Sequence, residues 1–118
     1  RIDHGVRCLE NPMLVERLRS AQTPLTVCPL SNIKLKVFPQ MAEHNIAAMD
    51  RAGLYVTINS DDPAYFGGYI NENFAAVQRA FDLDQAALVQ FAIRSVEASF
   101  ASGERKRSLR EEIIQATS

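Results

Sequence analysis

The sequence predicts an α/β fold whose short strands run parallel to one another. Three apolar runs end near His4, Cys28 and Ser60, and these ends lie 24 and 32 residues apart. Such spacings leave room for a helix after each strand, as in successive βα units. A polar cluster follows each run, and the carboxyl ends of parallel strands meet at one edge of a sheet, where binding and catalysis gather. We therefore expect one site built from three separate segments.

Signals for strands and helices alternate along the first half of the chain. The first strand ends near His4, and a helix follows that Asn11 caps and Pro12 opens, because Asn is a good N-cap and Pro fits the first turn. Residues 25–28 have β-propensity and form the second predicted strand. Residues 29–39 contain two prolines and several polar side chains, so we expect a loop there.

The second half is predicted to be mainly helical. A helix is expected over residues 41–52, ended by Gly53 in a left-handed conformation. Residues 54–58 form the third strand and are apolar on both faces, as parallel strands covered on both sides tend to be. Beyond a glycine hinge at residues 67–68 only helices are predicted, and the terminal helices occupy residues 84 to 118.

Composition excludes several classes of function. The net charge of -1 gives no reason to propose a nucleic-acid or membrane partner, and no apolar stretch approaches the ~20 residues that span a bilayer. Cys8 and Cys28 do not make a disulfide framework, which favours a reduced, cytoplasmic setting. Residues 1–118 suffice for one modest core. Because Arg1 opens inside a strand, we expect the chain to be a fragment of a longer protein.

Two adjacent carboxylates, Asp61 and Asp62, follow the third strand. Neighbouring carboxylates repel each other, so this pair is expected to contact a cation or a hydrogen-bonding ligand. One division of roles lets Asp61 ligate a metal and Asp62 bind substrate. The alternative is that Asp62 and Pro63 only start a turn or cap a helix, which is a common use of Asp.

The remaining candidates follow the first two strands. His4 suits proton transfer, metal ligation or charge stabilisation, or else it is a structural histidine bonded to a carbonyl. Ser31 and Asn32 either shape a pocket or bond to loop backbone. Cys28 is expected to be a small buried residue rather than a nucleophile, because no base accompanies it. His44 is expected to face solvent from the middle of a helix.

The ligands for a metal are too few within these residues. A catalytic zinc needs about three protein ligands, and the chain offers Asp61 and at most His4. Neither an HxH nor an HExxH motif is present. Either the site holds no metal, or the other ligands lie upstream of Arg1.

Three motifs in order give the chain a family resemblance. RIDHGV at 1–6, CPLSN at 28–32 and NSDDPAYF at 59–66 closely resemble the C-terminal half of the adenosine/adenine deaminase family. The stretch AIRSVEASF at 92–100 is similar to the segment that follows the barrel in that family. The extended form SDDPAYFGGY at 60–69 is closer to the adenine deaminase branch. The resemblance covers essentially the whole chain.

The resemblance implies a fold and residue roles. Members of the family are zinc-dependent (β/α)8 TIM barrels, and the chain would supply strands 6 to 8 with their helices. His4 matches the catalytic histidine that stabilises the attacking hydroxide, Asp61 matches the zinc-ligating aspartate, and Asp62 matches the aspartate that binds purine N7. The other zinc ligands and the proton-shuttling glutamate would lie in the missing N-terminal half of the barrel.

The implied reaction is hydrolysis of adenine to hypoxanthine and ammonia in purine salvage. This chain alone would neither hold zinc tightly nor catalyse. One alternative is adenosine or a modified adenosine as substrate, because free base and nucleoside differ only at N9. The other alternative is a non-catalytic half-barrel that serves as an interaction module.

Overall fold

Three parallel strands form the sheet of this protein. A computed structural model describes all 118 residues, and the sheet has the order β1-β2-β3. The strands are short: β1 covers Ile2–Asp3, β2 covers Leu25–Val27, and β3 covers Val56–Ile58. Leu25 pairs with Ile2 on one side and with Val56 on the other. The parallel α/β arrangement predicted from the sequence is therefore confirmed, with β1 and β3 as edge strands.

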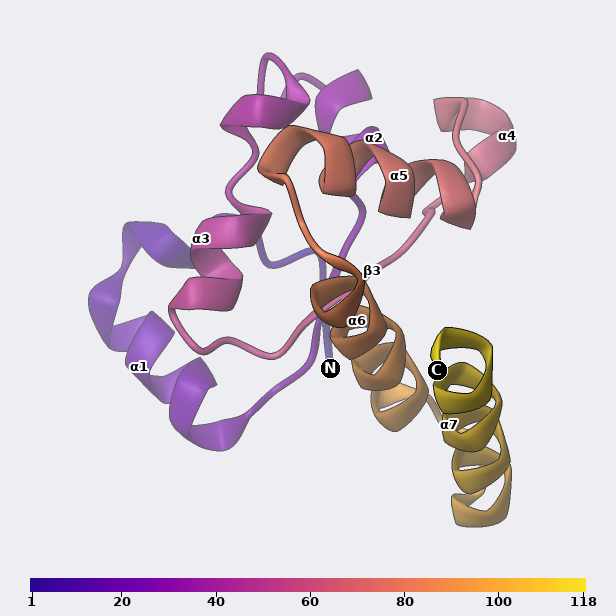
Figure 1. Cartoon of the computed structure of the whole chain (residues 1–118). Coiled ribbons are helices and arrows are strands. Elements are labelled where there is room, and N and C mark those ends of the chain that lie inside the picture. Colours follow the sequence, from indigo (N-terminus) through magenta and orange to yellow (C-terminus); the bar gives the residue numbers. More distant parts are fainter.

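Helices follow each strand and surround the sheet (Figure 1). Helices α1 and α3 lie together beside the sheet, α6 lies across β3, and α2, α4 and α5 gather beyond the carboxyl ends of the strands. The 3-10 turns are η1 (Cys8–Glu10) and η2 (Met41–Glu43), and the α-helices are α1 (Pro12–Ala21), α2 (Pro29–Lys34), α3 (Ile46–Arg51), α4 (Pro63–Phe66), α5 (Ile70–Phe81), α6 (Gln85–Ala98) and α7 (Gly103–Thr117).

Side-chain caps start α1, α4, α6 and α7, and the cap at Asn11 was predicted from the sequence. The Asn11 side chain accepts hydrogen bonds from the amides of Met13 and Leu14 at the start of α1, and Pro12 occupies the first turn. Asp84 caps α6 through the Ala87 amide. These caps satisfy amides that have no partner within the helix.

The core lies between the sheet and helices α1, α3, α5 and α6. Strand β3 is buried on both faces, as predicted, since Val56, Thr57 and Ile58 are each at most 1% exposed. Each fully buried aliphatic side chain contributes about 1.5–3 kcal/mol of transfer free energy. The buried apolar cluster consists of Val6, Cys8, Leu18, Leu25, Val27, Ile46, Met49, Leu54, Val56, Ile58, Val77 and Phe91.

The prediction of a loop over residues 29–39 is wrong for the first half of that segment, where the structure has helix α2. Pro29 occupies its first turn, and the polar side chains of Ser31 and Asn32 are buried against other elements. Propensity alone favours a loop for such residues, but their tertiary hydrogen bonds stabilise a helix of six residues. Helix α4 starts directly after Asp62, before the glycine hinge, as expected from the alternative in which Asp62 caps a helix.

The helix predicted over residues 41–52 is interrupted, and the prediction that His44 faces solvent is wrong. η2 ends at Glu43, His44 is extended (ψ 141°), and α3 begins only at Ile46. His44 is 3% exposed instead of facing solvent. Its Nδ1 accepts a hydrogen bond from the Ile46 amide, which takes the place of a helical bond and ends the continuity of the helix. Gly53 has φ +80°, as predicted for the end of this segment.

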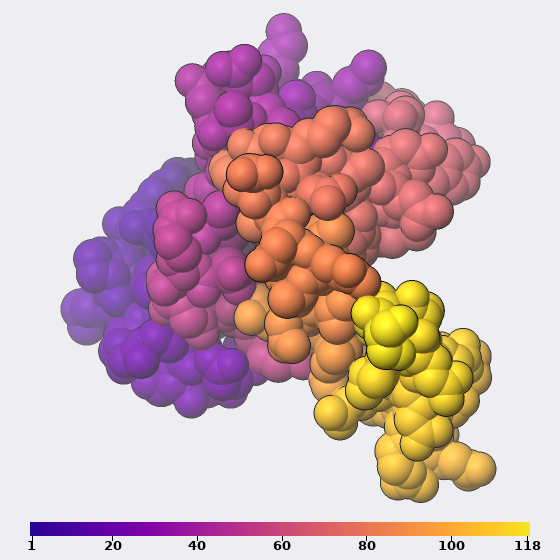
Figure 2. All heavy atoms as spheres, viewed as in Figure 1, coloured from indigo at the N-terminus to yellow at the C-terminus, as the bar shows by residue number.

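The terminal helices extend beyond the sheet. Helix α7 packs against α6 and projects from the body of the protein, as the yellow atoms in Figure 2 show. Lys106 Nζ donates to the Glu97 carbonyl at 2.8 Å, and Arg110 pairs with the Glu97 carboxylate at 3.2 Å. None of the helices combines the length and the apolar character that crossing a membrane requires.

Candidate functional site

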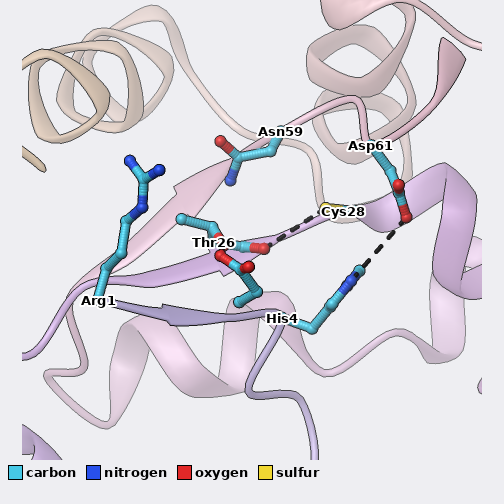
Figure 3. A pocket seen from close by; sticks show the side chains of 7 residues that line it. Arg1, His4, Thr26, Cys28, Asn59 and Asp61 are labelled. Carbon is cyan, nitrogen blue, oxygen red and sulfur yellow. Dashed lines mark hydrogen bonds and ion pairs between the residues drawn. The ribbon is translucent and has the colours of Figure 1, made fainter. Parts of the chain in front are cut away.

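A polar cleft of about 290 Å³ opens at the carboxyl ends of the three strands (Figure 3). His4 follows β1, Cys28 follows β2, and Asp61 follows β3, so the three segments predicted to share one site do meet. The complete lining is Arg1, Asp3, His4, Thr26, Cys28, Asn59 and Asp61.

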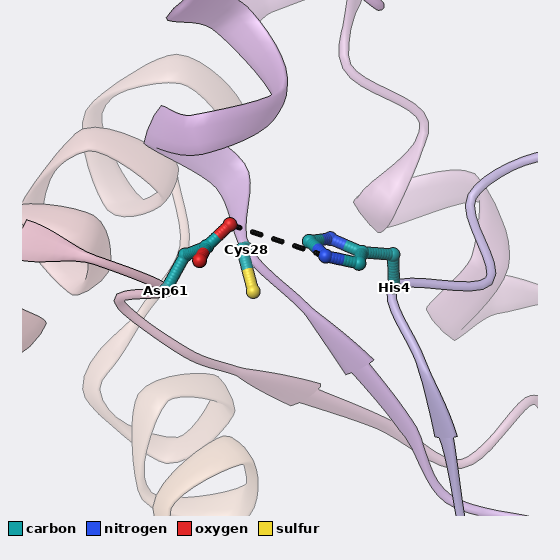
Figure 4. A group of neighbouring side chains, drawn as sticks. All are labelled: His4, Cys28 and Asp61. Atoms are coloured by element: carbon teal, nitrogen blue, oxygen red, sulfur yellow. Dashed lines mark ion pairs between the residues drawn. The ribbon is translucent and has the colours of Figure 1, made fainter. Parts of the chain in front are cut away.

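His4 and Asp61 face each other across this cleft (Figure 4). His4 Nε2 lies 3.9 Å from Asp61 Oδ2, which is too far for a direct hydrogen bond but suits a third atom bound by both groups. Both residues have left-handed backbone conformations, with φ 61° and 57°. Non-glycine residues seldom adopt this region, and such strain is typical of functional sites. His4 Nδ1 is buried and has no hydrogen-bond partner.

Ser31 fixes one oxygen of the Asp61 carboxylate. Its hydroxyl donates to Asp61 Oδ2 at 2.7 Å, and Ser31 itself is fully buried on α2. No protein hydrogen bond reaches Asp61 Oδ1, so that oxygen is available to a ligand in the cleft. Ser31 was expected either to shape a pocket or to bond to loop backbone. The structure supports the first role, because Ser31 contacts Asp61, the predicted metal ligand.

The Cys28 thiol lies between the two groups at the bottom of the cleft (Figure 4). Burial raises the pKa of this thiol to about 12, and the nearby negative charges of Asp61 and Asp3 add to the effect. The thiol is therefore neutral at physiological pH and is not a nucleophile, as the sequence predicts.

Asp62 is not part of the cleft lining. Its Oδ1 accepts a hydrogen bond from the Tyr65 amide at 3.1 Å and caps α4. The structure thus shows the helix cap that the alternative expects. The cap uses one oxygen of an exposed carboxylate, and no protein hydrogen bond reaches the other oxygen.

Thr26 belongs to the cleft although sequence reasoning did not single it out. Its hydroxyl donates to Asp3 Oδ1 at 2.9 Å and joins β1 to β2 at the cleft floor. Asn59 bridges β3 to β2, because its Nδ2 donates to the Val27 carbonyl at 3.2 Å. The only feature of the sequence that could have pointed to Thr26 is that it is a polar residue within the otherwise apolar run of β2.

The donor atoms in the cleft suit one side of a zinc site. One ligand atom each from His4, Cys28 and Asp61 lies within 4.8 Å of the others. Imidazole and carboxylate are common zinc ligands, and Asp61 Oδ1 has no competing protein partner. Because the Cys28 thiol is protonated in the metal-free cleft, Asp61 is the anionic donor of this group, and further ligands are needed to complete a tetrahedral set.

Comparisons with known proteins agree with this geometry. Residues 1–116 match the family model described as adenosine deaminase. The adenine deaminase of Hahella chejuensis is 59% identical over 109 residues, covering 92% of this chain and 33% of that protein. The adenine deaminase of Acinetobacter baylyi is 56% identical over 115 residues, covering 98% of this chain and 35% of that protein. The chain thus spans about a third of the length of the curated relatives it matches.

Solved structures give the same result for the fold. The crystal structure of adenine deaminase from Arthrobacter aurescens superposes with a TM-score of 0.96 at 44% identity, covering 98% of this chain and 36% of that one. A zinc-bound amidohydrolase from Burkholderia ambifaria superposes with a TM-score of 0.84 at 26% identity, covering 99% of this chain and 33% of that one. The α/β fold is therefore that of part of a TIM barrel, as the resemblance implies. With its family model matched from Arg1 to Ala116, the chain belongs to the adenosine deaminase family.

Proposed function

We propose that this chain is the C-terminal third of a zinc-dependent deaminase that hydrolyses adenine to hypoxanthine and ammonia. The observation that carries the proposal is the pair His4 and Asp61, held 3.9 Å apart across a cleft at the strand ends. The names of the similar proteins supply the substrate, since the relatives at 50–59% identity are adenine deaminases. Residues 1–118 would form strands 6 to 8 of the barrel and its terminal helices.

The proposed reaction replaces the amino group at C6 of adenine by the oxygen of water. When bound, zinc supplies a Lewis acid that brings the pKa of water from about 15.7 towards ~7. Asp61 would hold the metal, and its Oδ2 is fixed by Ser31. His4 Nε2 points to the same space as Asp61 Oδ2 and would stabilise the negative charge on the oxygen that attacks C6.

Asp62 is proposed to bind the purine edge. Its Oδ1 is committed to the Tyr65 amide, which fixes the carboxylate at the start of α4. The second oxygen is then available to a ring nitrogen of the substrate. One side chain thereby caps the helix and orients the base.

The zinc ligands that this chain lacks and the group that protonates the leaving ammonia are proposed to come from the other two thirds of the barrel. A cytoplasmic location is also proposed, in keeping with the free thiols of Cys8 and Cys28.

A modified adenine nucleotide is the second candidate substrate. The apo structure of the N6-methyl-AMP deaminase from Arabidopsis thaliana superposes with a TM-score of 0.86 at 26% identity. Adenine is favoured because the identity to adenine deaminases is about twice as high.

The test uses the full-length protein that carries this chain, purified, stripped of metal and reloaded with zinc. Ammonia release is measured with adenine, adenosine and N6-methyl-AMP at equal concentrations. We expect the highest kcat/KM for adenine and loss of turnover after metal removal. A preference for adenosine or N6-methyl-AMP, or no release by the zinc-loaded protein, contradicts the proposal.

A further inference from the structure

We propose that a buried polar cluster, made of Ser31, Asn32, His44 and Asn73, sets the orientation of Asp61 and that His44 and Asn73 are positioning residues acting through Ser31. This inference rests on the proposed function, because it assigns Asp61 a metal. Only five polar residues of the chain are buried: these four and Thr57. Burying polar side chains is costly unless each has a partner, so four in one place call for an explanation.

The cluster contacts Asp61 through a single hydroxyl. Ser31 Oγ donates to Asp61 Oδ2 at 2.7 Å, and the serine is fully buried while the aspartate is exposed. A charge-assisted bond of this length restricts rotation of the carboxylate. It therefore fixes Oδ2, which also lies 3.9 Å from His4 Nε2, and leaves Oδ1 without a protein partner.

Ser31 lies on a helix that is too short to hold itself in place. Helix α2 has six residues, and isolated helices of that length are unstable in water. The position of α2 must therefore come from contacts with other elements. The polar cluster supplies one such contact at Leu30 and another at Asn32, the two neighbours of Ser31.

His44 holds α2 from the side of α3. Because the Ile46 amide can only donate, His44 Nδ1 accepts that bond at 3.0 Å and the ring proton lies on Nε2. Nε2 then donates to Asn32 Oδ1 at 2.9 Å. Phe38 packs on the ring with centroids 4.5 Å apart. The imidazole thus has no freedom to turn, and Asn32, the neighbour of Ser31, is fixed with it.

Asn73 holds α2 from the side of α5. Its Oδ1 accepts from the Leu30 amide at 3.0 Å, and this amide belongs to the other neighbour of Ser31. Its Nδ2 donates to the carbonyls of Tyr69 at 2.9 Å and Gly68 at 3.3 Å. Leu30 is therefore bonded to Asn73 on α5, and Asn32 is bonded to His44. Ser31 lies between these two fixed residues, and its hydroxyl points towards Asp61.

The experiment measures zinc affinity of the full-length, metal-free protein by chelator competition, together with the melting temperature of the same metal-free samples. Ser31→Ala removes the bond to Asp61 and is expected to weaken zinc binding about 10- to 100-fold, as loss of a bond that orients a metal ligand typically does. A smaller loss of zinc affinity, about 3- to 10-fold, is expected for Asn73→Ala, because Asn73 bonds to the neighbour of Ser31 and does not contact Asp61 itself.

Two substitutions of His44 separate its hydrogen bonds. His44→Asn keeps an acceptor near the Nδ1 position but loses the donor to Asn32, whereas His44→Gln places an amide donor near the Nε2 position. We expect His44→Asn to weaken zinc binding about 3- to 10-fold and His44→Gln to restore most of that loss. Tyr55→Phe is the matched control, since it removes one hydrogen bond, from the hydroxyl to the Arg94 carbonyl, away from Asp61.

A double-mutant cycle tests whether His44 acts through Ser31. If it does, His44→Asn adds nothing to the loss of zinc affinity in Ser31→Ala. Additive losses, unchanged affinity in Ser31→Ala, or an equal loss in Tyr55→Phe overturn the inference. A protein that binds zinc but does not release ammonia from adenine contradicts the proposed function alone, because affinity is read without turnover. A wild-type protein that binds no zinc overturns both.

Discussion

The Ser31 hydroxyl and the Asp61 carboxylate lie 2.7 Å apart, although 30 residues separate them in the chain. Ser31 follows β2 and Asp61 follows β3, so the bond connects the ends of two neighbouring parallel strands. Parallel topology brings these ends to one edge of the sheet, and the left-handed backbone at Asp61 turns its side chain towards α2. The candidate site is therefore a product of strand pairing and of the left-handed backbone at its two facing residues, His4 and Asp61.

Replacing Asp62 separates its structural role as a helix cap from its proposed role in binding the substrate. Asn and Asp are equally good N-caps, so Asp62→Asn should leave the free energy of unfolding nearly unchanged. Asp62→Ala should cost about 1 kcal/mol, since the Tyr65 amide loses its partner. In the full-length protein both variants should deaminate adenine at least ~10-fold more slowly, because a hydrogen bond to a charged group is lost. Full activity of Asp62→Asn would show that the residue is only a cap.

His44 should make stability fall as the pH drops below about 6.5. Burial lowers the pKa of its imidazole from 6.5 to about 4. Between these values the unfolded chain binds a proton and the folded chain does not, so protonation favours unfolding. The loss reaches about 3 kcal/mol by pH 4. It is measured as the free energy of unfolding in urea at intervals from pH 7.5 to pH 4.

His44→Gln provides the reference for this pH profile, because carboxylates also titrate near pH 4. The difference in unfolding free energy between wild type and variant should be constant above pH 7 and should shift in favour of the variant as the pH falls from 6.5 to 4. Parallel curves over that range would mean that His44 is protonated equally in both states.

Cys28 should resist alkylation in the folded protein. With a pKa of about 12 the thiol is almost entirely protonated at pH 8, and it is buried. Iodoacetamide should therefore modify it at least ~100-fold more slowly in native protein than in urea, as measured by mass spectrometry of the labelled peptide. Cys8, which is also buried with a raised pKa, should behave in the same way. Rapid labelling of native Cys28 would contradict its burial.

Gly68 should not tolerate a side chain, because of Leu30. A Cβ at this glycine would overlap Leu30 Cδ1, so Gly68→Ala must displace the leucine side chain or α2. We expect a loss of about 1–3 kcal/mol in unfolding free energy. In the Leu30→Ala background the same change should cost clearly less, since the obstructing methyl is gone.

Gly103→Ala is the matched control for this prediction. A Cβ at Gly103 meets nothing within 4 Å, and the residue opens α7, where alanine is the better helix former. The control should be neutral or slightly stabilising. An equal loss at both glycines would mean that contact with Leu30 is not the cause.

Much of the architecture could be predicted because it depends on local patterns. The apolar run of β3, the cap at Asn11 and the left-handed Gly53 each follow from sequence and were confirmed. The predictions failed over residues 29–52, where α2 forms and a helix is interrupted. The polar residues of that segment satisfy their hydrogen bonds with partners far away in the chain, and periodicity contains no information about such partners.

The sequence by itself determined the order of βα units, the polar residues at three strand ends, and the family to which these motifs belong. Only the tertiary structure decided that Ser31 contacts Asp61, that His44 is buried against Asn32, and that Asp62 caps α4 outside the cleft. The physical reason is that a residue type sets which hydrogen bonds a side chain can make. The packing of α2 against η2, α4 and α5 sets which partner each side chain meets, and that packing is a property of the whole fold.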